Sequence, residues 1–416
     1  MKILVVGGGG REHTIVWKLR QSPRVTEIHC APGNGGIADM AKCVPIQATD
    51  IAGLVEYAKQ ERFDLVVVAP DDPLYMGLVD ALQAEGIRAF GPTAAGARLE
   101  GSKVYAKRLM QKYGIPTAQC EVFEDYEAAC GYVRNCELPI VVKADGLALG
   151  KGVLISNTVG EAISALDDIM VKRVFGDAGK RVVMEEFIQG PEVSVLAFCD
   201  GKTILPMASA QDHKRAFDGD KGPNTGGMGT FSPSPKYTDT VRAVVEETII
   251  RRTVDALQSE GVDYRGVLYF GLMLTKDGPK LLEYNARFGD PEAQVVLPRM
   301  SNDLLDVMDA VIDGRLHEVK LEWDERCAVC VVLASGGYPG SYPKGLPITG
   351  LADVLDAIVF HAGTAKQESV YVTAGGRVLG VTALGKDIAE AQEKAYAEVS
   401  KISFEGAQYR TDIGIK

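Results

Sequence analysis

The sequence predicts an α/β fold in three parts: a parallel sheet with crossover helices, a hairpin-rich region and a small α+β tail. Three observations carry this prediction. An apolar run at residues 2–6 meets four glycines and then a helical pattern, which is the order of elements in a doubly wound sheet. Strand-like runs that end in turn residues then recur to about residue 92. Strands come in neighbouring pairs from residue 138 to 285, and residues 326–416 hold further strands and one helix.

Length and composition bound the class of protein. A chain of 416 residues is long enough for two to four domains, and we place them at 1–100, 101–325 (with a subdomain at about 120–188) and 326–416. The net charge of −11 argues against a general binder of nucleic acid or anionic membranes. No apolar run approaches the roughly 18 residues that a spanning helix requires. We expect a cytoplasmic monomer with no nucleic-acid or membrane partner.

The first strand and its glycine turn are typical of a phosphate site. Gly7 and Gly9 fit the G-x-G-x-x-G pattern of dinucleotide-binding proteins, but the third position holds Glu12, where glycine is needed for close helix packing. The second strand, at residues 25–31, also lacks an acidic end for a ribose. The pattern therefore disfavours a nicotinamide cofactor and predicts a Rossmann-like domain that holds one phosphate.

Turns rich in glycine, proline or aspartate follow several of the early strands. They lie at residues 31–36, 70–74 and 91–93. Ligands bind at strand ends in open α/β sheets. Any one of these turns could be an ordinary connection, but their recurrence indicates a ligand cleft.

A glycine-rich hairpin that carries lysines is predicted in the middle region. A helix should run from Lys103 to about Tyr113. The strand at 138–143 ends in Lys143 and is followed by the glycine-rich residues 144–152 and a second strand. This is not a Walker A loop, because glycine follows Lys151 and a strand stands where a helix should. Such a hairpin tip can close over a triphosphate, although a solvated tip would have the same pattern.

Two later stretches give weaker indications. The backbone at residues 185–188, which follow a strand, can read adenine at the sheet edge, and Glu192 at the start of the next strand can bind ribose hydroxyls. Residues 218–231 are glycine-rich without apolar periodicity, which predicts a functional or disordered loop. An amphipathic helix at 240–260 then precedes two strands that should pair as a hairpin.

The end of that hairpin carries the candidate metal ligands. Glu283 and Asn285 stand two apart, so in a strand they project from the same face, with Arg287 next along it if the strand persists. Carboxylate and amide oxygens suit Mg²⁺ together with substrate phosphates. An arginine beside them suits a clamp on a phosphate or carboxylate. A strand end that runs into a polar turn is the plainer interpretation of the same residues.

Taken together, these stretches resemble the ATP-grasp ligases, and the whole chain resembles the glycinamide ribonucleotide synthetase family among them. The motifs that carry the resemblance are Gly8-Gly9-Gly10-Arg11-Glu12-His13, Pro32-Gly33-Asn34, the stretch from Lys143 to Val153, Asp212-His213-Lys214, Gly226-Gly227-Met228-Gly229 and Arg287-Phe288-Gly289-Asp290-Pro291-Glu292. One departure is Asp71, where the family usually has a glutamate. The resemblance implies a pre-ATP-grasp N-terminal domain, an ATP-grasp domain with a glycine-rich lid and a small C-terminal domain.

The resemblance also implies the cofactors, substrates and site residues. The reactants are ATP with Mg²⁺ or Mn²⁺, glycine and 5-phosphoribosylamine, and the products are glycinamide ribonucleotide, ADP and phosphate. The catalytic residues implied are Lys143, Asp212 and Arg287; the metal ligands are Glu283 and Asn285. The ATP-binding residues implied are Lys103, Lys143, Gly150, Lys151, Glu185, Glu186, Phe187, Ile188 and Glu192. The substrate-binding residues implied are Gly8, Gly9, Gly10, Arg11, Glu12, Asn34, Asp71, Asp212, Lys214, Gly227, Met228, Gly229, Arg287 and Asp290.

The implied reaction fits the residue types present. Transfer of the γ-phosphoryl group to a carboxylate needs positioning and charge neutralisation rather than a protein nucleophile, and the sequence contains no nucleophile elbow. Three alternatives remain open from the sequence. They are another ATP-grasp ligase or carboxylase of purine metabolism, a non-catalytic ATP-binding sensor, and the disfavoured nicotinamide oxidoreductase.

Overall fold

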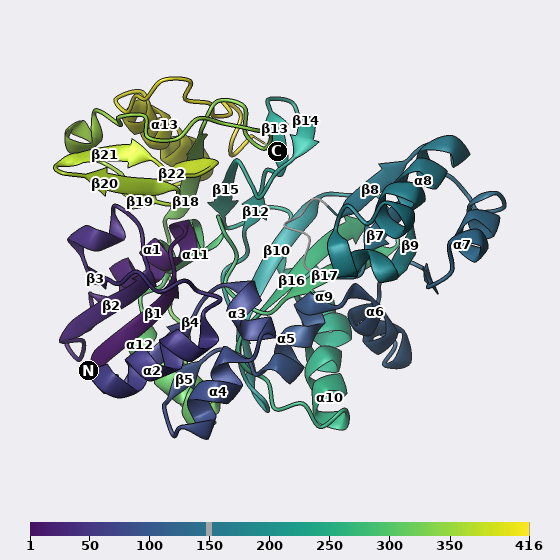
Figure 1. The fold of residues 1–416 in the computed structure, drawn as a ribbon, viewed down its shortest axis with the longest axis horizontal. Helices are drawn as coiled ribbons and strands as arrows, with labels where there is room; N and C mark the ends of the chain where they lie inside the picture. The colour runs from purple at the N-terminus through teal and green to yellow at the C-terminus, as the bar shows by residue number, and fades with distance from the viewer. Residues whose placement is uncertain (147–151, 416) are drawn as a thin grey trace.

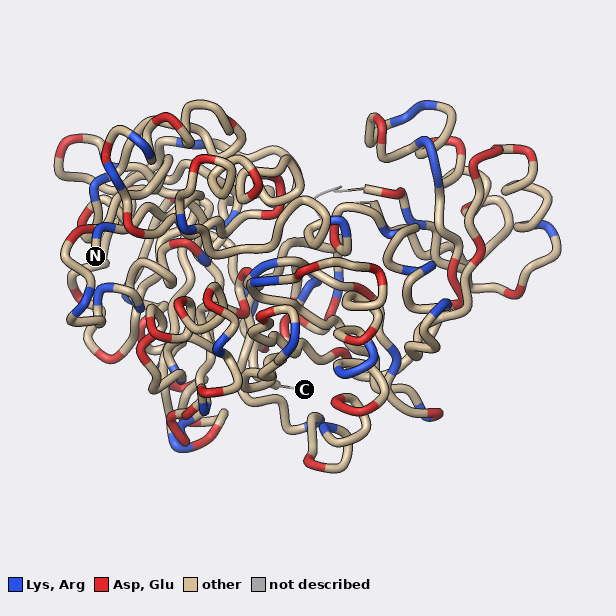
Figure 2. Tube along the Cα trace, turned by 90° about the horizontal axis from the view of Figure 1, so that it is seen from below, with Lys and Arg blue, Asp and Glu red and all other residues tan. Residues whose placement is uncertain are grey.

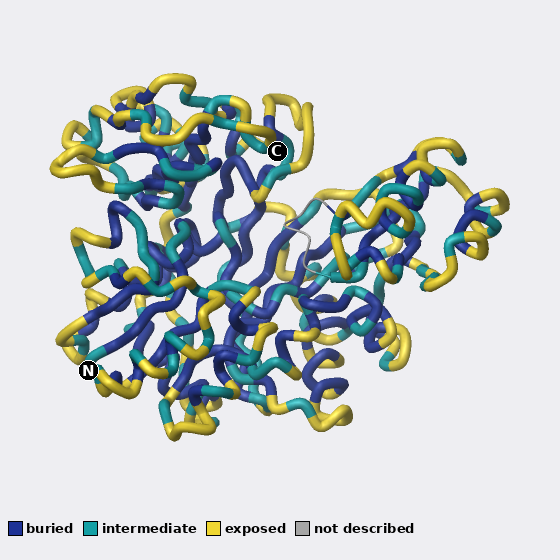
Figure 3. Tube along the Cα trace, in the orientation of Figure 1, coloured by how far each residue is buried: buried dark blue, intermediate teal, exposed yellow. Residues whose placement is uncertain are grey.

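The computed structural model describes residues 1–146 and 152–415. The N-terminal and C-terminal parts lie on one side of a central sheet, and a smaller sheet with its own helices lies on the other (Figure 1). Buried residues follow the central strands, and exposed residues follow the peripheral loops (Figure 3). Acidic and basic residues are interspersed over all parts of the molecule (Figure 2). Within the described residues, no helix is long and apolar enough to cross a membrane.

The N-terminal sheet is parallel, as predicted. Its strands are β1 (Lys2–Gly7), β2 (Glu27–Pro32), β3 (Lys42–Cys43), β4 (Leu65–Val68) and β5 (Ala89–Phe90), in the order β3-β2-β1-β4-β5. The helices around it are α1 (Gly10–Leu19), α2 (Ile51–Glu61), α3 (Asp71–Tyr75), α4 (Leu78–Ala84) and α5 (Ala94–Gly101). The central strands β1 and β4 are buried on both faces, which accounts for their continuous apolar runs.

The central sheet is antiparallel and holds the predicted hairpin. Its strands are β10 (Glu192–Asp200), β11 (Ile204–Pro206), β16 (Arg265–Thr275) and β17 (Gly278–Asn285), in the order β11-β10-β16-β17. The predicted helix at 240–260 is confirmed as α9 (Asp239–Val245) and α10 (Arg251–Ser259), joined by a π-helical segment, Glu246–Ile250. Helix α6 (Lys103–Lys112) contacts β17, and α12 (Leu304–Asp313) contacts β10 and β16.

The third sheet forms a subdomain with its own core. It comprises β6 (Cys120–Phe123), β7 (Ile140–Ala144), β8 (Val153–Ser156) and β9 (Val182–Glu186), in the order β6-β9-β7-β8, with helices α7 (Tyr126–Val133) and α8 (Val159–Leu166). The buried side chains of Val142, Met184 and Leu166 pack between strands and helices. The predicted glycine-rich tip at 147–151, with Gly150 and Lys151, lies outside the described residues.

The C-terminal sheet is built from two distant segments of the chain. Strands β18 (Cys327–Ala334), β22 (Arg377–Gly385) and β19 (Ile358–His361) are joined by β12 (Gln211–Asp212) and β15 (Gly229–Ser232), in the order β12-β15-β18-β22-β19. Helix α13 (Ile388–Val399) packs on this sheet, and β20 (Thr364–Gln367) and β21 (Val370–Thr373) form a separate hairpin.

The prediction of one long loop at residues 218–231 is wrong. These residues contribute β14 (Lys221–Asn224), which pairs with β13 (Arg215–Phe217), and most of β15. The sequence of β15 is Gly-Thr-Phe-Ser, which has little apolar character of its own. It is buried because it lies between β12 and β18, with Thr230 opposite Cys330. Tertiary pairing overrides local propensity here.

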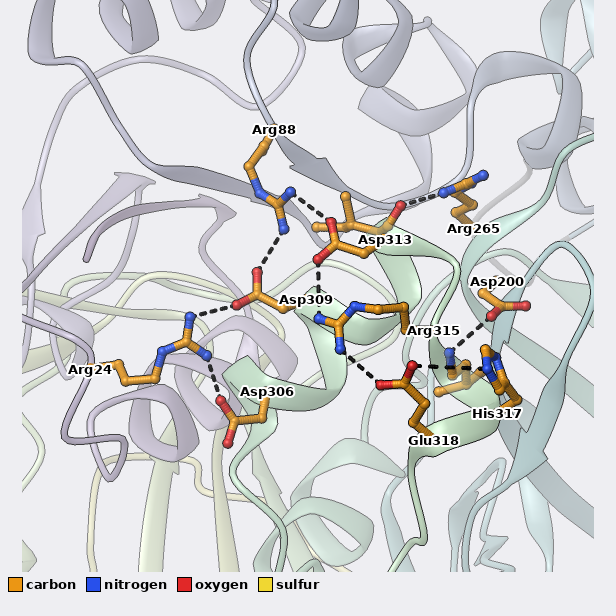
Figure 4. Close-up of polar contacts among 12 residues, drawn as sticks. Arg24, Arg88, Asp200, Arg265, Asp306, Asp309, Asp313, Arg315, His317 and Glu318 are labelled. Carbon is orange, nitrogen blue, oxygen red and sulfur yellow. Dashed lines mark hydrogen bonds and ion pairs between the residues drawn. The ribbon is translucent and has the colours of Figure 1, made fainter.

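A network of ion pairs fixes α12 to the N-terminal part (Figure 4). Asp309 accepts from two arginines: Arg24 Nη2 lies 2.7 Å from Asp309 Oδ2, and Arg88 Nη2 lies 2.8 Å from Asp309 Oδ1. Arg88 also pairs with Asp313 at 2.8 Å, and Arg24 pairs with Asp306. Asp309 is 8% exposed, so its carboxylate depends on these partners.

Removal of the Asp309 carboxylate should destabilise this junction. We expect Asp309→Ala to lower the free energy of unfolding by roughly 1–3 kcal/mol, because two arginines lose a shared, mostly buried partner. The loss is limited because the half-exposed guanidinium groups recover some hydration. Asp306→Ala is the matched control, since the Asp306 side chain is 61% exposed, and it should change the value by under about 0.5 kcal/mol. Urea unfolding followed by circular dichroism measures both. Equal effects of the two variants would contradict the assignment.

Candidate active site

A cleft of about 950 Å³ lies where the N-terminal part, the central sheet, the subdomain and the C-terminal sheet meet. Many of the predicted site residues border it. They are Arg11, Asp71, Lys103, Lys143, Glu185, Glu186, Phe187, Ile188, Glu192, Asp212, Lys214, Glu283, Asn285, Arg287 and Asp290. The structure therefore brings together residues that are up to 279 positions apart in the chain, as in the hydrogen bond from Arg11 N to Asp290 Oδ2. The individual roles of these residues stay predictions.

Glu283 and Asn285 lie at the end of β17, as the two-residue spacing predicts. Glu283 stands opposite Gly271 of β16, and Asn285 stands opposite Tyr269. A Cβ atom at Gly271 would come within 3.2 Å of Glu283 Cγ, so a larger residue there would displace the carboxylate. Among the residues that the structure describes, no cluster of three or more His, Cys, Asp or Glu side chains could hold a metal ion. Glu283 and Asn285 stay the predicted metal ligands.

Cationic side chains surround Glu283. Burial alone would raise the pKa of its carboxyl group, but Lys214, Lys143 and Lys103 face it and the net effect lowers the pKa below its usual value. Lys103 Nζ also donates to Gly146 O at 2.7 Å. Glu283 is thus held ionised among positive charges, an arrangement that suits binding of a polyphosphate beside a cation.

A buried carboxylate, Glu185, contacts one of these lysines and a further one. Glu185 Oε2 accepts from Lys143 Nζ at 2.9 Å and lies 3.1 Å from Lys107 Nζ. Lys107 also donates to Thr117 Oγ1 at 2.7 Å, which ties α6 to the loop before β6. The sequence analysis missed Lys107. The available signal was its spacing of four residues from Lys103, which places both side chains on one face of α6.

The predicted adenine segment, residues 185–188, begins in the last two residues of β9 and continues beyond the strand. Glu186, Phe187 and Ile188 border the cleft, and the Glu186 carboxylate pairs with Lys280 of β17 at 2.9 Å. Glu192, predicted to bind the ribose, pairs with Lys214 at 2.7 Å at the start of β10. This end of the cleft thus has the apolar side chains of Phe187 and Ile188 beside the carboxylates of Glu186 and Glu192.

Arg287 lies beyond the end of β17, which stops at Asn285, so it is not on the strand face. Glu100 of α5 holds it instead. Glu100 Oε1 accepts from Arg287 Nη2 at 2.7 Å, and Glu100 Oε2 accepts from Ala286 N at 2.7 Å. Burial raises the pKa of Glu100, and the Arg287 guanidinium opposes that shift. The sequence analysis missed Glu100, because no spacing pattern links the end of α5 to residue 287.

The glycine turn of the N-terminal sheet lies beside the cleft rather than on its wall. Gly8, Gly9, Gly10, Glu12 and Asn34 are absent from the described residues that border the cleft. Two of these residues have structural roles that the sequence analysis did not foresee. The Glu12 carboxylate accepts from Gly9 N at 2.6 Å and pairs with Arg11 Nε at 2.6 Å.

Asn34 stabilises the neighbouring loop through hydrogen bonds of its side chain. Its side-chain nitrogen donates to Gly8 O and His361 O, and its side-chain oxygen accepts from the backbone nitrogens of residues 36 and 37. All hydrogen-bonding positions of the amide are therefore used within the protein. The Asn34 side chain therefore positions the loop in this geometry, and the contact of Asn34 with substrate stays a prediction.

The segment Gly227, Met228 and Gly229 also lies outside the cleft wall formed by described residues. Met228 is fully buried, and its backbone nitrogen donates to His213 O at 2.8 Å. The Met228 side chain therefore has a packing role, and the substrate contact predicted for this segment stays a prediction. Arg377 of β22 borders the cleft instead and was not predicted.

The antiparallel central sheet, the second hairpin sheet and the cleft between them define an ATP-grasp protein. A biotin carboxylase domain of Hydrogenobacter thermophilus 2-oxoglutarate carboxylase, solved with MgADP and bicarbonate, has this fold. It superposes with a TM-score of 0.77 at 15% identity, over 98% of this chain and 91% of that chain. At this identity the likeness shows the fold alone.

Closer relatives narrow the class to one family. Models of the N, ATP-grasp and C domains of phosphoribosylglycinamide synthetase match residues 1–100, 101–293 and 328–416. The chain therefore belongs to the phosphoribosylglycinamide synthetase family, which confirms the resemblance and the three-part architecture.

Full-length relatives agree with this placement. Phosphoribosylamine–glycine ligase of Caldanaerobacter subterraneus is 50% identical over 99% of both chains. The Salmonella typhimurium ligase is 50% identical over 100% of this chain and 98% of that protein. The structure of the Thermotoga maritima ligase has a TM-score of 0.85 at 36% identity, over 99% of this chain and 100% of that one.

Loss of the Glu100 charge should misplace Arg287. We expect Glu100→Gln to lower kcat of the ATP-dependent reaction by roughly 10- to 100-fold, because a shift of about 1 Å in a positioning group can cost that much. Glu260→Gln, which removes a charge paired with Lys112 at the surface, should leave kcat unchanged. Steady-state kinetics at saturating ATP measures both. Wild-type kcat in a folded Glu100→Gln protein would contradict the positioning role.

Proposed function

We propose that this protein ligates glycine to 5-phosphoribosylamine at the expense of ATP, giving glycinamide ribonucleotide, ADP and phosphate in purine biosynthesis. The observation that carries the proposal is the cleft, which Glu283 and Asn285 border together with Lys103, Lys143, Lys214, Arg287 and Asp290. The relatives named as phosphoribosylamine–glycine ligases, at about half identity over the full chain, support it.

The chemistry requires that the carboxylate of glycine be activated. One of its oxygens attacks the γ-phosphorus of ATP, ADP leaves, and a glycyl phosphate forms. The amine nitrogen of phosphoribosylamine then attacks the carbonyl carbon; the C–O bond to phosphate breaks, phosphate leaves, and the nitrogen loses a proton. Both steps depend on alignment and on neutralisation of the phosphate charge.

The residues divide between the two substrates and ATP. Lys103 and Lys143 neutralise the phosphates, and the segment at 185–188 with Glu192 holds the nucleoside. Arg287 aligns the carboxylate or the transferring phosphoryl group; its Nε is buried and has no hydrogen-bond partner among the described residues. Asp212 and Asp290 are the candidates for the glycine ammonium group.

Phosphoribosylamine would occupy the N-terminal side of the cleft. Arg11 and Asp71 border it there. Burial would raise the pKa of Asp71, but Arg287 and Arg11 together lower it, so its carboxylate is held ionised. Aspartate is one methylene shorter than glutamate, and we propose that it reaches a ribose hydroxyl from the first turn of α3.

The donor set fits a hard divalent cation such as Mg²⁺ or Mn²⁺. Glu283 offers a carboxylate and Asn285 an amide oxygen, and two protein ligands leave room for phosphate oxygens and water. When bound, the cation would neutralise charge on the β- and γ-phosphates. Glu283 and Asn285 would hold it, and the lysines would bind the remaining phosphate oxygens.

Phosphate release tests the proposal directly. With ATP, Mg²⁺ and phosphoribosylamine present, we expect phosphate release to require glycine. Only the glycine carboxylate would be aligned both with the γ-phosphate of ATP and with the amine of phosphoribosylamine. Bicarbonate and formate serve as alternative carboxylates. Release with bicarbonate or formate would favour a sibling ligase or carboxylase. No release with any carboxylate, together with intact ATP binding, would favour an ATP sensor.

Neutralisation of Glu283 should remove most of this activity. We expect Glu283→Gln to lower kcat by on the order of 10² or more while the protein stays folded, since charge stabilisation is usually the largest catalytic contribution. Asp277→Asn, at the exposed turn of the same hairpin, is the control and should retain wild-type kcat. Unchanged turnover of Glu283→Gln at saturating Mg²⁺ would remove Glu283 from the site.

A further inference from the structure

Arg377 brings the C-terminal sheet into contact with the substrate end of the cleft. It is the first residue of β22, and its side chain borders the cleft. Its Nη1 donates to two backbone oxygens, Gly226 O and Asp290 O, both at 2.7 Å. Its Nη2 lies 3.4 Å from Asp290 Oδ1. One guanidinium thus joins three chain segments that are distant in sequence.

The turn at Gly226 and Gly227 is shaped to receive this guanidinium. A Cβ atom at Gly226 would lie 3.1 Å from Arg377 Cζ. Gly227 has a φ of +115°, and a Cβ atom there would lie 2.6 Å from Pro291 Cδ. Tyr338 OH also accepts from Gly226 N at 3.1 Å. Glycine is therefore required at position 227, and the absence of a side chain at Gly226 leaves room for the close approach of Arg377.

Both carboxylate oxygens of Asp290 have hydrogen-bond or ion-pair donors in this arrangement. Its Oδ1 accepts from Gln294 Nε2 at 2.9 Å and faces Arg377, and its Oδ2 accepts from Arg11 N at 3.2 Å. Burial would raise the pKa of Asp290, but Arg377 and Arg11 lower it below its usual value. A partly buried carboxylate that remains ionised is suited to an ammonium group.

The sheet that delivers Arg377 also carries Asp212. Strand β22 pairs with β18, β18 pairs with β15, and β15 pairs with β12, where Asp212 lies. Hydrogen-bonded strands hold both side chains in a fixed relation. The two acidic candidates for an ammonium group, Asp212 and Asp290, are therefore both set by the C-terminal sheet, one directly and one through Arg377.

We propose that Arg377 is a positioning residue for the amino-acid substrate, and that the C-terminal sheet thereby completes the substrate site. Arg377 orients the Asp290 carboxylate toward the ammonium group of the amino acid. It also holds the Gly226–Gly227 turn next to Asp290 through its hydrogen bond to Gly226 O. The proposal rests on the proposed function in naming glycine as the amino acid. It predicts a defect in glycine binding that leaves ATP binding intact.

The test compares Arg377→Met and Arg377→Lys with the wild-type full-length protein. We expect Arg377→Met to raise KM for glycine at least tenfold and to change KM for ATP by less than twofold. Arg377→Lys should recover part of the glycine KM, because it keeps the charge but not the two-pronged donor. Arg326→Met is the control, since its guanidinium pairs with Asp324 at the surface, and both KM values should stay unchanged.

A double-mutant cycle separates positioning from general stabilisation. If Arg377 acts through Asp290, then Asp290→Asn and Arg377→Met should be strongly non-additive in KM for glycine. Thermal midpoints and ADP titration by calorimetry report whether each variant is folded with an intact nucleotide site. An unchanged glycine KM, equal rises in both KM values, additivity in the cycle, or loss of folding in Arg377→Lys would each overturn the proposal. Absence of glycine-dependent turnover in the wild type would overturn the proposed function as well.

Discussion

The burial of opposite charges around Glu283 is the constraint on which the cleft depends. A carboxylate in this position stays ionised only because lysines from separate parts of the chain face it. Lys103 comes from α6, Lys143 from β7 and Lys214 from the segment after β12. Like charges so close together repel one another, which a polyphosphate would relieve. The lysines that lower the stability of the protein through their mutual repulsion are therefore the groups that a bound polyphosphate would stabilise most.

The segment that follows β17 shows how the surrounding parts share this constraint. Residues 286–292 contain no strand or helix of their own, so few backbone hydrogen bonds fix them. Glu100 holds Arg287 from the N-terminal side, and Arg377 holds Asp290 from the C-terminal side. The chemistry of the segment is thus set by two ion pairs that approach from opposite directions. The positions of these side chains therefore depend on contacts from both the N-terminal and the C-terminal parts.

The sequence predicted the architecture and most of the cleft, because both leave local signals. Apolar runs with turn residues located β1, β4, β7 and β17, and the two-residue spacing of Glu283 and Asn285 indicated a shared face. Lys107 was missed although its spacing from Lys103 was a local signal. The other omissions have no local signature: Glu100 and Arg377 reach the cleft only through tertiary packing, and β15 is a strand because of its neighbours. Asn34 was recognised by its motif, but the motif could not show that its amide is already saturated.

The shared C-terminal sheet has a consequence for how the chain can be divided. Strand β15 lies between β12 and β18, so it is an interior strand although it belongs to the preceding region of sequence. A protein that ends before residue 327 would leave the β18 side of β15 without a partner. Its unpaired N–H and C=O groups would then form a free sheet edge, which invites pairing with other chains. The last ninety or so residues therefore protect the solubility of the rest.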